Sequence, residues 1–156
     1  MFTNLSRMIP LENVALDLVV ADKEQLFDEV AQLLATACAL SAESIYQCLL
    51  EREQLASTAL GHGVAIPHGR MKGLKTPVAA FVRLAEPLPF DAPDGLPVNL
   101  LIVFLIPASV TQKHLEILSE IAEMFSDVEF RSVLTHEKTP DVIHNRLVEW
   151  RPAYSA

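Results

Sequence analysis

Apolar residues recur at helical spacing in the N-terminal part of the chain. Between Lys23 and Leu40 they return every three or four positions, which predicts an amphipathic helix. Ser41 is a favourable N-cap, so a second helix should run from it to about Glu53. A short strand is expected before both helices, around Val14–Val20. This part of the chain is therefore expected to supply one strand and two helices.

Three apolar runs in the middle of the chain predict strands. The small, glycine-containing stretch 56–63 should be a loop that leads into the first run, Val64–Ile66. The second run is Pro77–Leu84, and the third is Val98–Ile106. The third is almost continuously apolar, as expected for a strand covered on both faces. Prolines and an Asp-Gly pair predict a loop over residues 86–95, between the second and third strands.

Helical spacing returns in the C-terminal third. It predicts a helix from Thr111 to about Phe125 and further helical segments over Val128–Leu134 and Pro140–Trp150. Strands in the middle with helices before and after them indicate an α/β layered domain whose central sheet has helices on both sides. At 156 residues the chain is expected to be a single domain, residues 1–156.

Composition and charge exclude two classes of protein. Hydrophobic residues make up 51% of the chain, so an intrinsically disordered protein is excluded. A net charge of −8 argues against a nucleic-acid surface, which requires a basic patch. The one local cluster of cations is Arg70, Lys72, Lys75 and Arg83. It is either solvated surface or a docking site for an acidic partner.

The cysteines and the N-terminus point to a cytoplasmic protein. Cys38 and Cys48 lie in helical patterns beside apolar residues, so we expect free buried thiols in a reducing compartment. The N-terminal residues do not resemble a signal peptide. The most apolar stretch, residues 98–106, is too short to cross a bilayer, so no membrane insertion is expected.

Residues 60–70, with the sequence LGHGVAIPHGR, carry the most informative chemistry. Pro67 ends the apolar run, and His68 follows it directly. Gly69 removes a side chain beside His68 and should leave room for a large reactant. An imidazole held at a strand end in this way suits a nucleophile, and nucleophilic histidines commonly handle phosphoryl groups.

The same segment resembles the active-site signature of the mannitol/fructose-type IIA proteins of the bacterial phosphotransferase system, most closely its nitrogen-regulatory group. The similarity extends from about Leu5 to Trp150. It implies a three-layer fold with a central mixed β-sheet, the mannitol-type IIA fold, and a core of about residues 5–150. It also implies that His68 is phosphorylated on its tele nitrogen, Nε2, by a phosphohistidine carrier protein. No metal or organic cofactor is required by such chemistry.

Arg52 extends an apolar stripe along the second helix, formed by Ile45, Cys48 and Leu49. A guanidinium in that position either reaches out to solvent or points into a site. The helix leads directly into the loop before His68, and the planar guanidinium suits phosphate oxygens. The family resemblance also assigns the arginine of a Leu-x-x-Arg-Glu segment to the active site, so we expect Arg52 there.

His114 extends the apolar stripe of the Thr111–Phe125 helix, formed by Leu118, Ile121, Ala122 and Phe125. Taken alone, it is ordinarily a hydrogen-bonded, partly buried histidine. Its place in the first helical turn, where anions bind well, favours a site residue. In the family a histidine in this His-Leu-x-x-Leu context lies beside the phosphorylated one, so we expect His114 in the site.

Weaker candidates surround these three residues. Gly61, Gly63 and Thr58 are expected to support phosphate binding, by backbone N–H groups or a hydroxyl, although loop capping explains Thr58 equally well. Backbone N–H groups at the Thr111 helix start are a further candidate. His62 is interpreted as a contact at the rim of the loop, and His136 and His144 as surface residues.

Three functions remain open on the sequence. The first is a regulatory phosphocarrier of a nitrogen-type phosphotransferase system, whose target proteins respond to its phosphorylation state. The second is a sugar-specific IIA component that passes phosphate to a membrane permease partner, which would use the same site. The third is a metal hydrolase with His62, His68 and His114 as ligands, although their spacing matches no metal signature. The regulatory function is preferred because the chain most resembles the nitrogen-regulatory group.

Overall fold

A mixed six-stranded sheet forms the centre of the computed structural model, which describes residues 4–109 and 112–151. The strands are β1 (Val14–Leu18), β2 (Ala59–Gly61), β3 (Val64–Ala65), β4 (His68–Met71), β5 (Val78–Leu88) and β6 (Val98–Pro107). Their order is β1-β5-β6-β3-β2, and β4 pairs with β6 beyond the end of β3. Pairing is parallel for β1 with β5 and for β6 with β3 and β4, and antiparallel for β5 with β6 and for β2 with β3.

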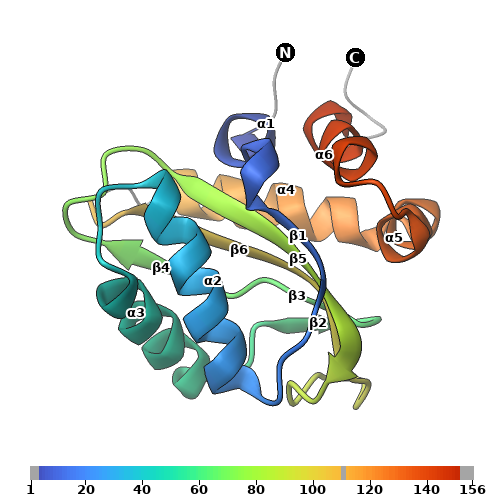
Figure 1. Ribbon diagram of the computed structural model, residues 1–156. Coiled ribbons are helices and arrows are strands. Elements are labelled where there is room, and N and C mark those ends of the chain that lie inside the picture. The colour runs from blue at the N-terminus through green and yellow to red at the C-terminus, as the bar shows by residue number, and fades with distance from the viewer. Residues whose placement is uncertain (1–3, 110–111, 152–156) are drawn as a thin grey trace.

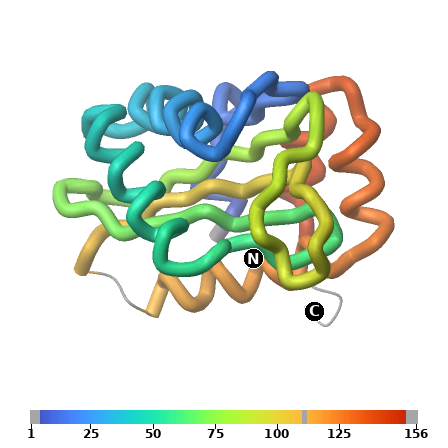
Figure 2. Tube along the Cα trace, turned by 90° about the horizontal axis from the view of Figure 1, so that it is seen from below, coloured from blue at the N-terminus to red at the C-terminus, as the bar shows by residue number. Residues whose placement is uncertain are grey.

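Helices cover both faces of the sheet, so the predicted three-layer fold is confirmed (Figures 1 and 2). On one face lie α2 (Lys23–Ala37) and α3 (Ala42–Leu55). On the other face lie α1 (Asn4–Met8), α4 (Gln112–Ser126), α5 (Val128–His136) and α6 (Pro140–Glu149). The predicted start of α4 at Thr111 lies outside the described residues. A short 3-10 helix, η1 (Leu11–Asn13), precedes β1.

Strand β6 contributes side chains to both hydrophobic cores. Leu101, Val103 and Leu105 pack in the core beneath α2 and α3, and the alternate residues, among them Ile102 and Phe104, pack beneath α4. Successive side chains of a strand point to opposite faces, so a continuous apolar run fills both layers. The interpretation of residues 98–106 as a central, doubly covered strand is confirmed.

Caps fix where the N-terminal helices begin. Asp22 accepts a hydrogen bond from the Gln25 N–H at the start of α2, and Ser41 accepts one from the Ser44 N–H at the start of α3. The predicted N-cap at Ser41 is therefore confirmed. Helix α2 ends at Ala37, before the predicted end at Leu40.

The chain around the motif differs from the prediction. Residues 59–61, expected in a loop, form β2, and the strand does not end at Pro67. It is interrupted there and resumes as β4, with the Pro67 carbonyl accepting a hydrogen bond from the Phe104 N–H. Strand β5 also runs to Leu88, into the predicted loop. Strand β4 exists through pairing with β6, which is distant in sequence, whereas β2 pairs with the adjacent β3 across a tight turn.

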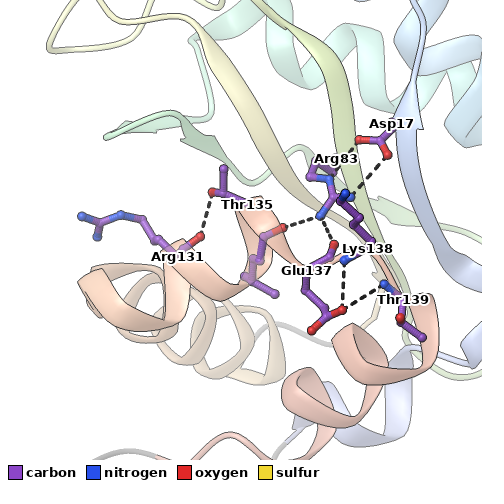
Figure 3. Close-up of polar contacts among 8 residues, drawn as sticks. Asp17, Arg83, Arg131, Thr135, Glu137, Lys138 and Thr139 are labelled. Carbon is purple, nitrogen blue, oxygen red and sulfur yellow. Dashed lines mark hydrogen bonds and ion pairs between the residues drawn. The ribbon is translucent and has the colours of Figure 1, made fainter.

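Arg83 does not belong to the surface cluster of cations in which the sequence placed it. It is only 5% exposed, and its guanidinium donates to the carboxylate of Asp17 in β1 and to the backbone carbonyls of Leu134 and Glu137 (Figure 3). Arg83 thus links β5 to β1 and to the end of α5, and its buried guanidinium is not part of a docking surface.

Candidate functional site

His68 is the first residue of β4 and is only 6% exposed. Its ring stacks on the buried Phe104 of β6, with centroids 5.1 Å apart and an interplanar angle of 10°. Its Nδ1 lies 2.6 Å from the carbonyl oxygen of Ile66. A carbonyl can only accept, so Nδ1 carries the proton and Nε2 keeps its lone pair. The backbone thus selects Nε2 as the nucleophilic nitrogen.

The surroundings of His68 keep its ring neutral. Burial, partly offset by the hydrogen bond to Ile66, lowers the pKa of His68 from 6.5 to about 4. The nearby His114 and Arg52 lower it further, whereas Glu53 acts in the opposite direction. At neutral pH the imidazole therefore retains the lone pair that a nucleophile requires.

An open pocket of about 360 Å³ brings the predicted site residues together. Its lining includes His68 from β4, Arg52 from α3 and His114 from α4. His114 stands edge-on to His68, with ring centroids 4.9 Å apart at 84°. Burial, followed by the charges of Arg70 and Arg52, lowers the pKa of His114. The site thus combines a neutral nucleophile, a neutral second imidazole and a guanidinium.

The two motif glycines that were expected to contact phosphate lie outside this pocket. Gly61 (φ +97°) and Gly63 (φ +80°) form the turn between β2 and β3, in a backbone conformation that favours glycine. A Cβ on Gly61 would lie 3.1 Å from the Asp94 carboxylate, and one on Gly63 would lie 2.8 Å from the Asn99 side chain. Neither glycine lines the pocket, so the structure supplies no support for their predicted phosphate contact. His62, between them, is exposed and donates its N–H to Asp94.

Thr58 lines the pocket, but its hydroxyl proton is already used. The hydroxyl donates to one carboxylate oxygen of the buried Glu53 at 2.6 Å, and the Thr58 N–H donates to the other. Lys23 completes this cluster with a 3.2 Å ion pair to Glu53. A hydroxyl has one proton, so Thr58 in this arrangement cannot also donate to a phosphoryl oxygen. Its contacts instead hold the loop between α3 and β2.

Comparison with known proteins identifies the family. The model of the family described as "Phosphoenolpyruvate-dependent sugar phosphotransferase system, EIIA 2" matches residues 7–150. The chain belongs to this family.

Relatives and a solved structure agree with this assignment. A nitrogen regulatory protein of Pseudomonas aeruginosa is 38% identical over 128 residues, covering 81% of this chain and 83% of that protein. A fructose-specific EIIA component of Haloferax volcanii is 32% identical over 148 residues, covering 94% and 96%. The crystal structure of the nitrogen regulatory protein IIA-Ntr from Neisseria meningitidis is 42% identical, with a TM-score of 0.87, and covers 91% of this chain and 97% of that one. The expected IIA fold is therefore confirmed.

Gly69 has a different role in this IIA chain from the one expected. Its φ is not in the left-handed region, and a Cβ on it would lie 2.3 Å from the Sγ of Cys48 in α3. The missing side chain therefore lets α3 pack closely against β4, rather than opening the approach to His68. Close packing at this position also fixes the helix that carries Arg52.

Sequence reasoning missed two residues beside the site, Phe104 under the His68 ring and Arg70 next to His114, and it gave no role to Glu53 behind the loop. Phe104 sits opposite His68 in the β4–β6 register, which requires knowledge of strand pairing. Arg70 is two residues after His68, so strand periodicity would have found it had β4 been predicted.

The predictions for the cysteines and for the peripheral histidines are confirmed in part. Cys38 and Cys48 are free, as predicted, but both are half-buried, and Cys38 lies just beyond the end of α2. His136 is exposed as expected, whereas His144 is half-buried and bonded to the Ile9 carbonyl. Across residues 4–109 and 112–151, no helix is long and apolar enough to span a membrane.

The arrangement of potential metal ligands bears on the third function, the metal hydrolase. Within the described ranges, no three His, Cys, Asp or Glu residues are grouped so that they could hold a metal ion. The hydrolase alternative therefore gains no support here.

Proposed function

We propose that this chain is a regulatory phosphocarrier of a nitrogen-type phosphotransferase system, acting in the cytoplasm. It accepts a phosphoryl group on His68 from a phosphohistidine carrier protein and controls target proteins according to its phosphorylation state. The observation that carries this proposal is the neutral His68 ring, with Nδ1 tied to Ile66 and Nε2 free in a pocket shared with Arg52 and His114.

The transfer uses residues already in place. The lone pair of His68 Nε2 attacks the phosphorus of the carrier's phosphohistidine, a new N–P bond forms, and the old bond breaks with its electrons returning to the carrier's ring. Positive charge develops on the His68 ring as Nε2 becomes bonded. The Ile66 carbonyl, which accepts from Nδ1–H, stabilises that charge.

The phosphoryl oxygens need donors, because the transferred group spreads negative charge over them in the transition state. Arg52 lines the pocket and can present guanidinium N–H groups, even though its Nη1 also donates to the Ala56 carbonyl at 2.8 Å. His114 can present a ring N–H from the opposite wall. Together these two residues would hold the labile phosphoramidate once it has formed.

The surface around the pocket fits a protein partner. Leu55 at the end of α3 is 83% exposed, Leu115 in the first turn of α4 is 62% exposed, and Leu60 on the pocket rim is 43% exposed. Exposed apolar side chains on the elements that carry a buried reactive group are typical of a protein docking surface. Phosphorylation would bring about −1.5 to −2 charges to this surface, which suffices to change which targets bind.

The similarity to a fructose-specific EIIA component keeps sugar transport as the second candidate. The test incubates the purified protein with phosphoenolpyruvate, enzyme I and either a nitrogen-type or a sugar-type carrier. We expect the wild-type protein to be labelled faster by the nitrogen-type carrier, and His68→Ala not to be labelled. The control is His62→Asn, an exposed turn residue whose φ of +56° asparagine tolerates. Faster labelling by the sugar-type carrier, with onward transfer to a permease domain, would favour transport.

A further inference from the structure

Arg70 lies next to the reacting histidines without lining their pocket. It follows His68 by two residues on β4, so its side chain leaves the same face of the strand, toward α4. Its Nε lies 3.5 Å from Nδ1 of His114, a long hydrogen bond. Arg70 lines instead a neighbouring groove along α3. Arg70 therefore contacts His114 directly, but it does not line the pocket in which a phosphoryl group on His68 would lie.

The contact between Arg70 and His114 has one possible polarity. A guanidinium has donors and no acceptor, so Nδ1 of His114 must accept. The proton of the neutral His114 ring is then on Nε2, where it can be donated into the pocket. His68 shows the opposite assignment, because its Nδ1 donates to Ile66 and its Nε2 is bare. The two rings therefore offer one lone pair and one donor, as transfer to His68 requires.

We propose that Arg70 is a positioning residue, which holds His114 in the Nε2–H tautomer and in the orientation that serves a phosphoryl group on His68. This inference rests on the proposed function for its effect on transfer, but not for its effect on His114 itself. Three charged or titratable groups face His114 from the elements packed against it: Arg52 of α3, and His68 and Arg70 of β4.

A double-mutant cycle separates positioning from direct phosphate contact. If Arg70 acts through His114, Arg70→Met should slow phosphoryl acceptance about tenfold or more in the wild-type background, because a small misplacement of a catalytic group is costly. The same substitution should have no further effect on His114→Ala. An equal slowing in both backgrounds, or no slowing in either, would overturn the inference.

Two variants control for charge and folding. Arg70→Lys keeps the cation and an N–H donor, so it should retain most of the rate. Lys72→Met removes a neighbouring exposed cation that contacts neither ring, so it should leave the rate unchanged. If Lys72→Met slowed transfer as much as Arg70→Met, the role of Arg70 would be general attraction of the carrier, and the inference would fail.

A measurement on the unphosphorylated protein keeps the inference independent of the proposed function. In ¹⁵N-detected titrations of the imidazoles, Arg70→Met should raise the pKa of His114, since one of the charges that lower it is gone. The Nδ1 resonance of His114 should also shift from the position of an unprotonated nitrogen toward that of a mixture of the two tautomers. Unchanged His114 resonances would overturn the positioning role. Failure of the wild-type protein to take phosphate would instead overturn the proposed function, while the titration would still decide the role of Arg70.

Discussion

Replacing Gly69 by alanine tests the packing that sets the wall of the site. The new Cβ would lie 2.3 Å from Cys48 Sγ, more than an ångström inside ordinary contact distance. The clashing sulfur belongs to a short, half-buried side chain on α3, so the sulfur must rotate to another position or α3 and β4 must move apart. Forcing an extra carbon into a packed interface typically costs 1–3 kcal/mol, and we expect Gly69→Ala to lower the free energy of unfolding by about 2 kcal/mol.

The structure also supplies the rescue for Gly69→Ala. The Cys48 Cβ would be 3.8 Å from the new Cβ, an ordinary contact, so only the sulfur clashes. Cys48→Ala in the same chain should therefore recover most of the loss, giving a coupling energy of about 1–2 kcal/mol in urea unfolding at constant m-value. A Gly69→Ala protein within about 0.5 kcal/mol of wild type, or a double variant no more stable than the single one, would show that this contact does not set the packing of α3 on β4.

Three further predictions address the ring, the loop and the C-terminal half. Because the pKa of His68 is lowered from 6.5 to about 4, the unfolded state binds the extra proton first. The contribution of His68 should therefore lower the free energy of unfolding as pH falls from 6.5 toward 4. If protonation of His68 alone limits the rate, phosphoryl acceptance should stay level from pH 8 to about 5. A rate that is halved near pH 6.5 would contradict this. Glu53→Gln removes the ion pair to Lys23 and one acceptor for Thr58, so chemical denaturation should show a loss of about 1–2 kcal/mol and labelling should slow. Arg83→Met should cost about 2 kcal/mol by leaving two backbone carbonyls without their donor, with the labelling rate unchanged; altered labelling would show that the buried cation reaches the site.

The parts of the fold that could be predicted are those with local signals. Helix α2 and strand β6 have long, regular apolar patterns, and Ser41 marks the start of α3 with its own side chain. Strand β4 escaped prediction because it is short, contains Gly69, and exists through its pairing with β6. Helix α1 has five residues, too few for a periodic pattern.

Local sequence signals likewise separate the site residues that could be predicted from those that could not. The Pro-His-Gly context that marks His68 is local, and the apolar stripes place Arg52 and His114 on the inward faces of their helices, although only the family resemblance assigns those two residues to the site. For Thr58 the sequence leaves phosphate binding and loop capping equally open, and in the structure its hydroxyl donates to Glu53. No pattern within one segment reveals which distant acceptor a side chain will meet, so second-layer contacts of this kind need the fold.

The decisive measurement is the position of the phosphoryl group on the histidine ring. The protein is labelled with ¹⁵N in its imidazoles, phosphorylated by the carrier system, and studied by ³¹P and ¹⁵N NMR. Because Nδ1 of His68 donates to the Ile66 carbonyl, the expected result is phosphorus bonded to Nε2 of His68, with Nδ1–H retained. Phosphorus on Nδ1 of His68, or on His114 instead, would contradict it.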